Sequence, residues 1–309
     1  MMDLPGAVAA DPPDESVAAH YGDPFREQRR LATGEGFVDL SHRPVVRVSG
    51  PDRLTWLHSL TSQHLSALAP NQATEALVLS PHGHVEHALY LVDDGEATWL
   101  HLEPGTAEGL VGFLNSMRFM LRVEVSDLTA DWAVVWQPVG EPDPGCLTRV
   151  GRRGRELFVP RAELARWAAG AGPPAGIWAA EALRVAAREP RLGFETDHRT
   201  IPHEVGWLET AVHLNKGCYR GQETVARVHN LGRAPRRLVF LHLDGSVETL
   251  PPHGAPVQFG DRQVGFVTSA ARHYELGPIA MALVRRNTPT DAPLLAGGVA
   301  AAQEVVVAA

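Results

Sequence analysis

Residues 235–309 carry the pattern that most restricts the fold of this chain. Short runs of mostly apolar residues follow Pro235, and Gly, Pro and Asp separate each run from the next. The runs are RLVFLHL, PVQFG, QVGFVTSA, IAMALVRR and QEVVVA. Short strands with a turn signal after each predict a small antiparallel barrel or sandwich. We therefore expect a C-terminal antiparallel β-barrel over 235–309.

The preceding region, residues 21–234, mixes strand and helix signals. VVRVSG at 45–50 alternates like a strand, and PDRLTWLHSL follows with Pro51 in a first helical turn. Leu54, Leu57 and Leu60 fall on one helical face. The pattern predicts an α+β fold. The other predicted elements are strands at 73–80, 84–92, 97–102, 121–125 and 131–136, and helices over 106–120, whose apolar face includes Leu121, and 176–189.

Composition limits the classes of partner. Lys and Arg number 28 against 36 Asp and Glu, a net charge of −8 with no long basic run, so we expect no nucleic acid partner. No uninterrupted apolar stretch approaches membrane-spanning length, and we expect no membrane association. Two cysteines favour a reducing compartment. Residues 1–20 are acidic, rich in Pro and Ala, and unlike a secretory signal, so we predict a disordered N-terminal tail and a cytoplasmic protein.

A single cysteine lies in an unusual setting within HLNKGCYRGQETVARVHN, residues 213–230. Lys216 and Arg220 flank Cys218, glycines stand at 217 and 221, and a helix is predicted just beyond. Cations and a helix N-terminus both favour a thiolate, which predicts a functional thiol with Lys216 as its cation. The alternative is a buried cysteine that packs as a small hydrophobe. Gln222 and Glu223 could bond the helix's open N–H groups or face the site.

Two other groups of side chains suggest weaker sites. His82, His84 and His87 could suggest a metal, but along a strand their imidazoles would not converge on one ion, and we expect no metal site. Cys146 lies in a Pro-, Gly- and Arg-rich stretch at 138–155 that is predicted to be an exposed connection. We interpret this cysteine as an incidental surface thiol.

The octapeptide KGCYRGQE at 216–223 resembles the K-G-C-Y-x-G-Q-E signature of YgfZ-type folate-binding proteins. These are relatives of the glycine cleavage T-protein, an aminomethyltransferase that uses tetrahydrofolate. GFVDLSHRPVVRVSGPDRLTWLHSL, LVLSPHGHVEHALYLV, EALRVAAREPRLGFETDHRTIPHEVGW, RRLVFLHLDG and VGFVTSAARHYELGPIAMALVRR resemble further segments of that superfamily. The resemblance covers roughly residues 36 to 290.

The resemblance implies a fold and a ligand. Two intertwined α+β lobes, within 21–234, and a C-terminal β-barrel would surround a folate-binding hole. The cofactor would be tetrahydrofolate or a one-carbon derivative. Glu204 matches the glutamate that accepts from the pterin ring, and Arg236 and Arg237 match a basic pair, one of which contacts the glutamyl tail. The cysteine signature would add Gly217, Tyr219, Gln222 and Glu223 to the binding site.

One departure from the family bears on mechanism. The aminomethyltransferases carry a pair of aspartates where this chain has His87 and Ala88. Glu86 projects from the opposite face of the predicted strand, and Asp93 lies at its far turn. The resemblance therefore implies a tetrahydrofolate-binding accessory protein that supports assembly, repair or maintenance of iron–sulfur proteins through Cys218, with those proteins or their assembly factors as partners.

Two alternatives stay open at this point. A tetrahydrofolate-dependent aminomethyl- or methyltransferase could use His87 as its base. A folate-independent thiol enzyme could pair Cys218 with His213 or His229.

Overall fold

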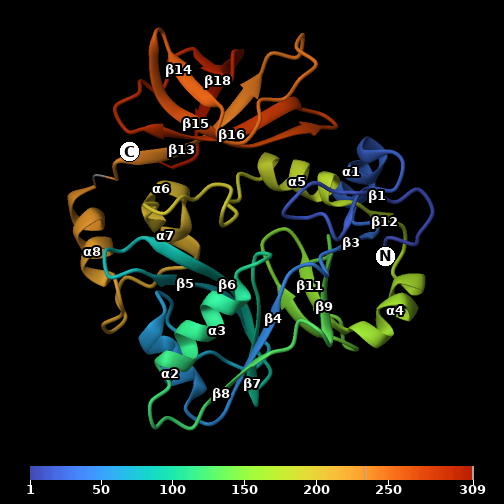
Figure 1. The fold of residues 1–309 in the computed structure, drawn as a ribbon, viewed down its shortest axis with the longest axis vertical. Helices are drawn as coiled ribbons and strands as arrows, with labels where there is room; N and C mark the ends of the chain where they lie inside the picture. Colours follow the sequence, from blue (N-terminus) through green and yellow to red (C-terminus); the bar gives the residue numbers. More distant parts are fainter. Residues whose placement is uncertain (233, 308–309) are drawn as a thin grey trace. The chain divides into compact units, whose positions relative to one another are not determined.

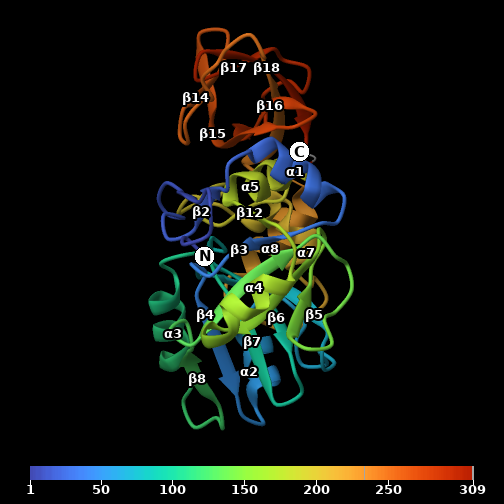
Figure 2. The ribbon, with the colours of Figure 1, turned by 90° about the vertical axis from the view of Figure 1, so that its right-hand side faces the viewer.

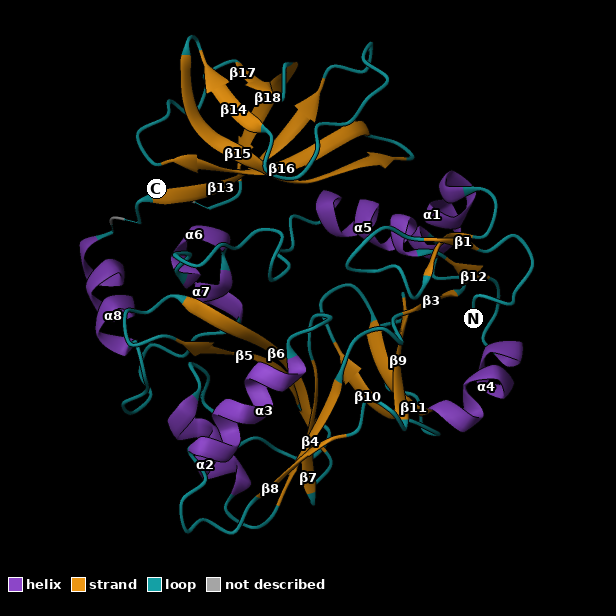
Figure 3. Ribbon diagram, in the orientation of Figure 1, coloured by secondary structure: helices purple, strands orange, loops and turns teal. Residues whose placement is uncertain are grey.

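A computed structural model describes residues 1–232 and 234–307. Contacts divide the chain into two compact units. The first unit comprises Met1–Val78, His87–Ala180 and Asn215–Tyr219, and the second comprises Leu79–Glu86, Glu181–Leu214 and Arg220–Ala309. Both contain helices and strands (Figure 3), so the predicted α+β class is confirmed.

The first unit contains a five-stranded sheet covered by two helices. α2 (Arg53–Leu60) and α3 (Ala107–Ser116) lie beside this sheet (Figure 1). Their leucines pack against alternate residues of the strands, such as Val46 and Val48, and this burial forms a core. The sheet order is β5 (Ala73–Leu79), β6 (Val85–Asp93), β7 (Ala97–His101), β4 (Val45–Ser49) and β8 (Glu124–Asp127).

A second sheet in this unit is built from strands that precede and follow the first sheet in the sequence. Its order is β10 (Leu147–Val150), β11 (Arg155–Pro160), β9 (Trp132–Gln137), β3 (Phe37–Asp39) and β12 (Pro174–Ala175). β3 precedes the first sheet in the chain, whereas β9 to β12 follow it, so the two sheets are intertwined in sequence. The accompanying helices are α1 (Pro24–Ala32), η1 (Arg161–Glu163), α4 (Leu164–Gly170) and α5 (Ile177–Ala186), which runs into the second unit.

The N-terminal segment is structured, contrary to the prediction of a disordered tail. β1 (Val8–Ala9) and β2 (Ala18–His20) pair antiparallel. Val17 is buried, and the Asp14 carboxylate lies 2.9 Å from His42 Nε2. The prediction was wrong because small apolar residues without periodicity can still pack against a neighbouring element, and such tertiary contacts leave no periodic signal.

The second unit contains the closed barrel that the C-terminal pattern predicts. Inward residues such as Val239, Leu241 and Ala282 form its core, and Figure 2 shows the strands closing on themselves. The expected domain boundary at residue 235 lies just before the first barrel strand, but the compact unit also includes earlier segments. The barrel order is β13 (Arg236–Leu243), β16 (Gly277–Arg285), β15 (Arg262–His273), β14 (Pro256–Phe259), β17 (Leu294–Ala296) and β18 (Val299–Val305). The unit's helices are α6 (Pro202–Val205), α7 (Trp207–Thr210) and α8 (Gln222–Leu231).

Two local predictions need correction. The helix expected over 106–120 ends at Ser116, and Leu121 is exposed rather than part of its apolar face. The stretch 138–155 is not simply an exposed connection, because it contains β10, which pairs with β11. Cys146 packs beside the buried Val135 and Leu157, and burial raises the pKa of its thiol. Among the described residues, no helix is long and apolar enough to cross a membrane.

Candidate functional site

The turn Asn215–Tyr219 alternates buried and exposed side chains. Lys216 and Tyr219 are buried, whereas Gly217 and Cys218 between them are exposed. The Lys216 ammonium lies 4.9 Å from the centre of the Tyr219 ring, within the range of a cation–π contact. Burial raises the pKa of the Tyr219 phenol to about 12, so it stays protonated. Two anchored side chains thus present the Cys218 thiol at the surface.

Lys216 is bound to the C-terminal end of α2. Its ammonium donates to the carbonyl oxygens of His58, Thr61 at 2.5 Å and Gln63 at 3.1 Å. The last carbonyls of a helix are unpaired and carry partial negative charge, so a cation stabilises them. Burial lowers the pKa of Lys216 to about 8, which leaves the ammonium charged at neutral pH. The prediction that Lys216 acts as the cation of the thiol is not supported by these bonds, because they direct the ammonium toward α2.

Gly221 ends the turn and begins α8, as the sequence predicts for a helix here. Its φ is +82°, and a Cβ there would lie 2.6 Å from Ser80 O and 2.9 Å from Gly83 Cα. Only glycine fits both the conformation and the space. A Cβ at Gly217 would meet nothing within 4 Å. Of the two predicted glycines, Gly221 is the one that the backbone requires.

Arg220, the second cation predicted beside the thiol, has a carboxylate partner of its own. The Arg220 guanidinium lies 3.0 Å from the Glu86 carboxylate, so Arg220 is paired rather than reserved for the thiol. Gln222 is half-buried and Glu223 is exposed in the first turn of α8. Cys218 precedes that turn by four residues, as the numbering shows. Its accessible position is therefore the main feature of the site.

The strand β6 carries His87 and Ala88 where the resemblance to the aminomethyltransferases implies a pair of aspartates. Ala88 is buried, and His87 is half-buried with a pKa lowered by burial, so its imidazole is neutral at pH 7. Glu86 pairs with Arg220. Asp93 is 1% exposed and accepts from Arg53 Nη2 at 2.7 Å and Thr98 Oγ1 at 2.6 Å. Both nearby carboxylates therefore serve structural contacts.

The other histidines predicted from sequence do not form a metal-binding group. The His82 and His84 ring centres lie 6.2 Å apart. In the described part of the chain, no set of three His, Cys, Asp or Glu side chains is placed to hold a metal.

His229 is one of the two histidines predicted as a possible base for Cys218. It lies seven residues into α8, roughly 10 Å along the axis from the start of that helix.

Glu204 and Arg236 are brought together, but by bonding to each other. Arg236 Nε and Nη2 donate to the two Glu204 oxygens at 2.9 and 2.8 Å, and the Ile201 N–H donates to Glu204 at 3.1 Å. Arg236 also contacts Asp197 at 2.6 Å, and Arg236 holds the pKa of that carboxyl well below its usual range. Glu204 is 0% exposed and its carboxylate is engaged by Arg236, and its role as a pterin acceptor stays a prediction.

Arg237 is a structural residue of the barrel. It is 1% exposed, and its guanidinium donates to the carbonyl oxygens of Arg286 at 2.7 Å and Thr288 at 2.9 Å. These bonds fix the end of β13 to the loop after β16. The prediction that one of the basic pair contacts a folate tail is not supported for Arg237, whose donors are directed to backbone oxygens.

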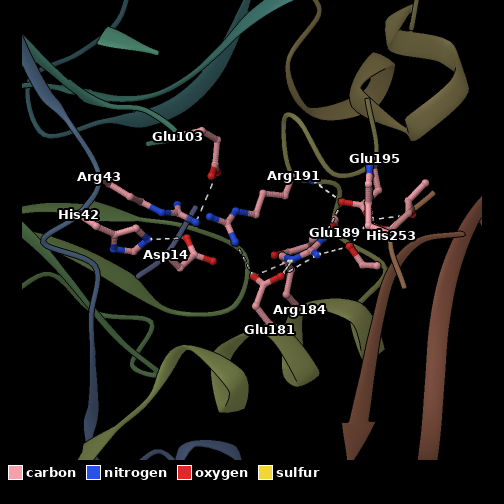
Figure 4. A network of polar contacts seen from close by, with 12 residues as sticks. Asp14, His42, Arg43, Glu103, Glu181, Arg184, Glu189, Arg191, Glu195 and His253 are labelled. Atoms are coloured by element: carbon pink, nitrogen blue, oxygen red, sulfur yellow. Dashed lines mark hydrogen bonds and ion pairs between the residues drawn. The ribbon is translucent and has the colours of Figure 1, made fainter. Parts of the chain in front are cut away.

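A buried acidic network in the second unit was missed from the sequence. Glu195 is 0% exposed and accepts from four donors: Arg184 and the Arg191 N–H on one oxygen, and Thr268 and Ser269 on the other. Figure 4 shows Arg184 between Glu181 and Glu195. Glu181, Arg184 and Glu195 lie close together in the sequence, and this spacing could have predicted the network. The same figure shows the first unit's pairs Arg43–Glu103 and His42–Asp14.

Comparison with known proteins agrees with this architecture. Residues 236–307 match the glycine cleavage T-protein C-terminal barrel domain. The whole chain superposes on a glycine cleavage system aminomethyltransferase T from Bartonella henselae with a TM-score of 0.83, covering 100% of this chain and 94% of that one at 18% identity. The fold is that of the glycine cleavage T-protein superfamily.

Curated relatives that match in sequence carry different names. An aminomethyltransferase of Rubrobacter xylanophilus is 28% identical, with 92% of this chain and 85% of that protein aligned. A mitochondrial iron–sulfur cluster assembly factor IBA57 homolog of Mycosarcoma maydis is 26% identical, with 65% of this chain and 55% of that protein aligned. What the comparisons show for this chain is the fold, and the function within that fold is a matter for proposal.

Proposed function

We propose that this protein is a tetrahydrofolate-binding accessory factor that supports the assembly, repair or maintenance of iron–sulfur proteins through Cys218. The observation that carries the proposal is the exposed thiol on a turn anchored by Lys216 and Tyr219. The similarity to an iron–sulfur cluster assembly factor homolog supports the same pathway.

The thiol's isolation favours a transient role. The chain has two cysteines, and Cys146 is partly buried within a packed cluster. Resident iron–sulfur clusters are held by several protein ligands, commonly four thiolates. One exposed thiol instead suits a brief bond to cargo supplied by a partner. The Cys218 thiolate could coordinate iron after loss of its proton, or attack the outer sulfur of a partner's persulfide, breaking that S–S bond and releasing the partner's thiolate. The partners would be iron–sulfur proteins or their assembly factors.

The surroundings of β6 support an accessory role over aminomethyl transfer. Such a transfer needs a positioned acid–base group. His87 and Ala88 replace the aspartates, and the neighbouring Glu86 and Asp93 are engaged with arginines. We infer that the superfamily's transfer chemistry is absent or strongly reduced.

Folate binding is proposed from the fold, without an assigned contact residue. Of the residues predicted to hold the ligand, Glu204 and Arg236 bond each other and Arg237 bonds the barrel backbone, so none of these three is assigned as a contact here. The remaining predicted ligand residues, Gly217, Tyr219, Gln222 and Glu223, stay predictions. Calorimetry with tetrahydrofolate tests binding directly. Glu204→Gln should then retain an affinity within about threefold of wild type, since a pterin contact would cost roughly tenfold or more.

Replacement of the thiol tests the central claim. Cys218→Ser should reduce iron–sulfur enzyme activity at least about tenfold in cells that lack the endogenous protein, while Cys146→Ser should match wild type. Because Cys218 is exposed, its replacement should change the unfolding free energy by less than about 0.5 kcal/mol. Full support by a folded Cys218→Ser protein would overturn the proposal.

A tetrahydrofolate-dependent transferase is the second candidate, favoured by the neutral imidazole of His87, whose buried Nδ1 has no partner among the described residues. Incubation with tetrahydrofolate and an aminomethyl donor would reveal it as methylene-tetrahydrofolate. Formation that disappears in His87→Ala, and persists in Cys218→Ser, would establish this function in place of the accessory role.

A further inference from the structure

The first unit contains a cavity of about 830 Å³ that the proposed function does not use. The N-terminal segment, α1 and α4 surround it. Leu4, Phe37, Leu164 and Ala168 contribute apolar walls, and Phe37 is 1% exposed. Cavities of several hundred Å³ with apolar walls and a few polar groups are typical small-molecule sites.

Two arginines of α1 line the same cavity. Arg26 and Arg30 are four residues apart, so they lie on one face of the helix. Within residues 1–232 and 234–307, neither guanidinium has a carboxylate partner. Unpaired guanidinium groups beside an apolar wall favour a ligand with an anionic end, because they provide planar sets of donors.

The acidic residues of the lining are mostly engaged elsewhere. Glu27 accepts from the backbone N–H groups of Tyr21 at 2.7 Å and Gly176 at 2.8 Å. Asp23 accepts from the first N–H groups of α1. Two other cations of the lining are also engaged: Arg161 donates to the carbonyl oxygens of Thr129 and Ser41, and the Met1 ammonium lies 3.5 Å from the Asp39 carboxylate. Asp3 is the remaining lining carboxylate, and it opposes an anion.

Tyr21 adds a neutral donor. Its hydroxyl oxygen is buried and has no hydrogen-bond partner among the described residues. Burial and the nearby Asp39 and Glu27 raise the pKa of Tyr21 well above its usual value, so the hydroxyl keeps its proton. A buried hydroxyl without a partner is unfavourable, and a ligand acceptor would satisfy it.

We propose that this cavity binds a small organic anion with an apolar body, whose carboxylate or phosphate end is held by Arg26, Arg30 and Tyr21. The apolar body contacts the wall formed by Phe37, Leu164 and Ala168. This site is separate in its residues from the Cys218 turn, so it stands or falls independently of the iron–sulfur proposal.

Calorimetry with decanoate, decyl phosphate and decanol tests the site on the full chain. At least one of the two anions should bind with a dissociation constant in the micromolar range, and decanol should bind at least about tenfold more weakly. The comparison of decanoate with decyl phosphate identifies the preferred anionic group. Equal binding of decanol, or no binding of either anion, would overturn the proposal.

Matched variants locate the binding. Arg26→Gln with Arg30→Gln should weaken the anion about tenfold or more, and Tyr21→Phe about three- to tenfold. Arg29→Gln, on the same helix but outside the lining, should leave the affinity unchanged, whereas Asp3→Asn should strengthen it. Tyr21→Phe removes only an unpaired hydroxyl, so it should remain folded. Unchanged affinity in both the double variant and Tyr21→Phe would contradict the assignment.

Discussion

The turn around Lys216 and the cluster around Arg236 both bury part of a long cationic side chain, but they leave different atoms accessible. Lys216 donates to backbone carbonyls at the end of α2, and Cys218 remains exposed two residues along. Arg236 binds Asp197 and Glu204, and the Glu204 carboxylate is then completely covered. Lys216 fixes the backbone of its turn and leaves the neighbouring Cys218 accessible. Arg236 instead neutralises the carboxylates with which it pairs.

This difference changes how each region should respond to mutation. In the cluster, charges satisfy one another, so substitutions should lower stability rather than ligand affinity. In the turn, the anchors should affect stability and Cys218 should affect function alone. The following experiments test this division, from the largest expected effect to the smallest.

Glu204→Gln should lower the free energy of unfolding by about 3–4 kcal/mol, because breaking a buried ion pair leaves charge poorly compensated. Urea denaturation measures the loss. Glu209→Gln, at an exposed position on α7, is the matched control and should stay within about 0.5 kcal/mol of wild type. A stable Glu204→Gln protein that no longer binds tetrahydrofolate would reverse our interpretation of the cluster.

Acid should destabilise the folded protein through His203, which lies in α6 next to Glu204. Burial lowers the pKa of His203 to about 4, and neither ring nitrogen has a partner among the described residues. The unfolded chain therefore binds more protons between pH 6.5 and 4, and up to about 3 kcal/mol of stability is lost as pH falls through that window. His203→Phe should remove this part of the pH dependence in denaturation at pH 6.5 and 4. Equal slopes in the two proteins would contradict it.

Gly221→Ala should cost about 2–3 kcal/mol, because the added Cβ meets Ser80 O at 2.6 Å and the residue must keep a positive φ. Gly217→Ala is its control within the same turn, and it should cost less than about 0.5 kcal/mol since its Cβ enters open space. Thermal unfolding compares the two variants. Similar losses from both would mean that the turn is held differently.

Lys216→Met should cost about 2 kcal/mol, because the carbonyls of His58, Thr61 and Gln63 lose a charged donor. Met keeps most of the side-chain volume, so the loss reports the bonds. Denaturant unfolding gives the stability, and iron–sulfur enzyme activity in cells gives the function. If Lys216 only positions the thiol, the loss of iron–sulfur enzyme activity should be partial. It should be explained by the lower stability of the Lys216→Met protein and not by a change in the reactivity of Cys218.

Local sequence patterns determined most of the fold. Apolar alternation with turn residues predicted the barrel, and the leucine spacing of 54–60 predicted the helix that packs on the first sheet. The flanking cations and glycines indicated Cys218 as the residue to examine, just before a predicted helix that the structure contains. These features are local because a strand or helix repeats its own period along the chain.

Only the tertiary structure decided the partners of the charged residues. Lys216 meets carbonyls more than 150 positions away in the chain, and Arg236 meets Glu204 and Asp197 across more than 30. The ordered N-terminal segment likewise depends on contacts such as Asp14 with His42. A charged side chain takes whichever partner folding brings within a few ångströms, and in the interior that choice has large energetic consequences. Sequence spacing contains no record of that distance, so the roles of Lys216, Glu204 and Arg237 could be assigned only from the fold.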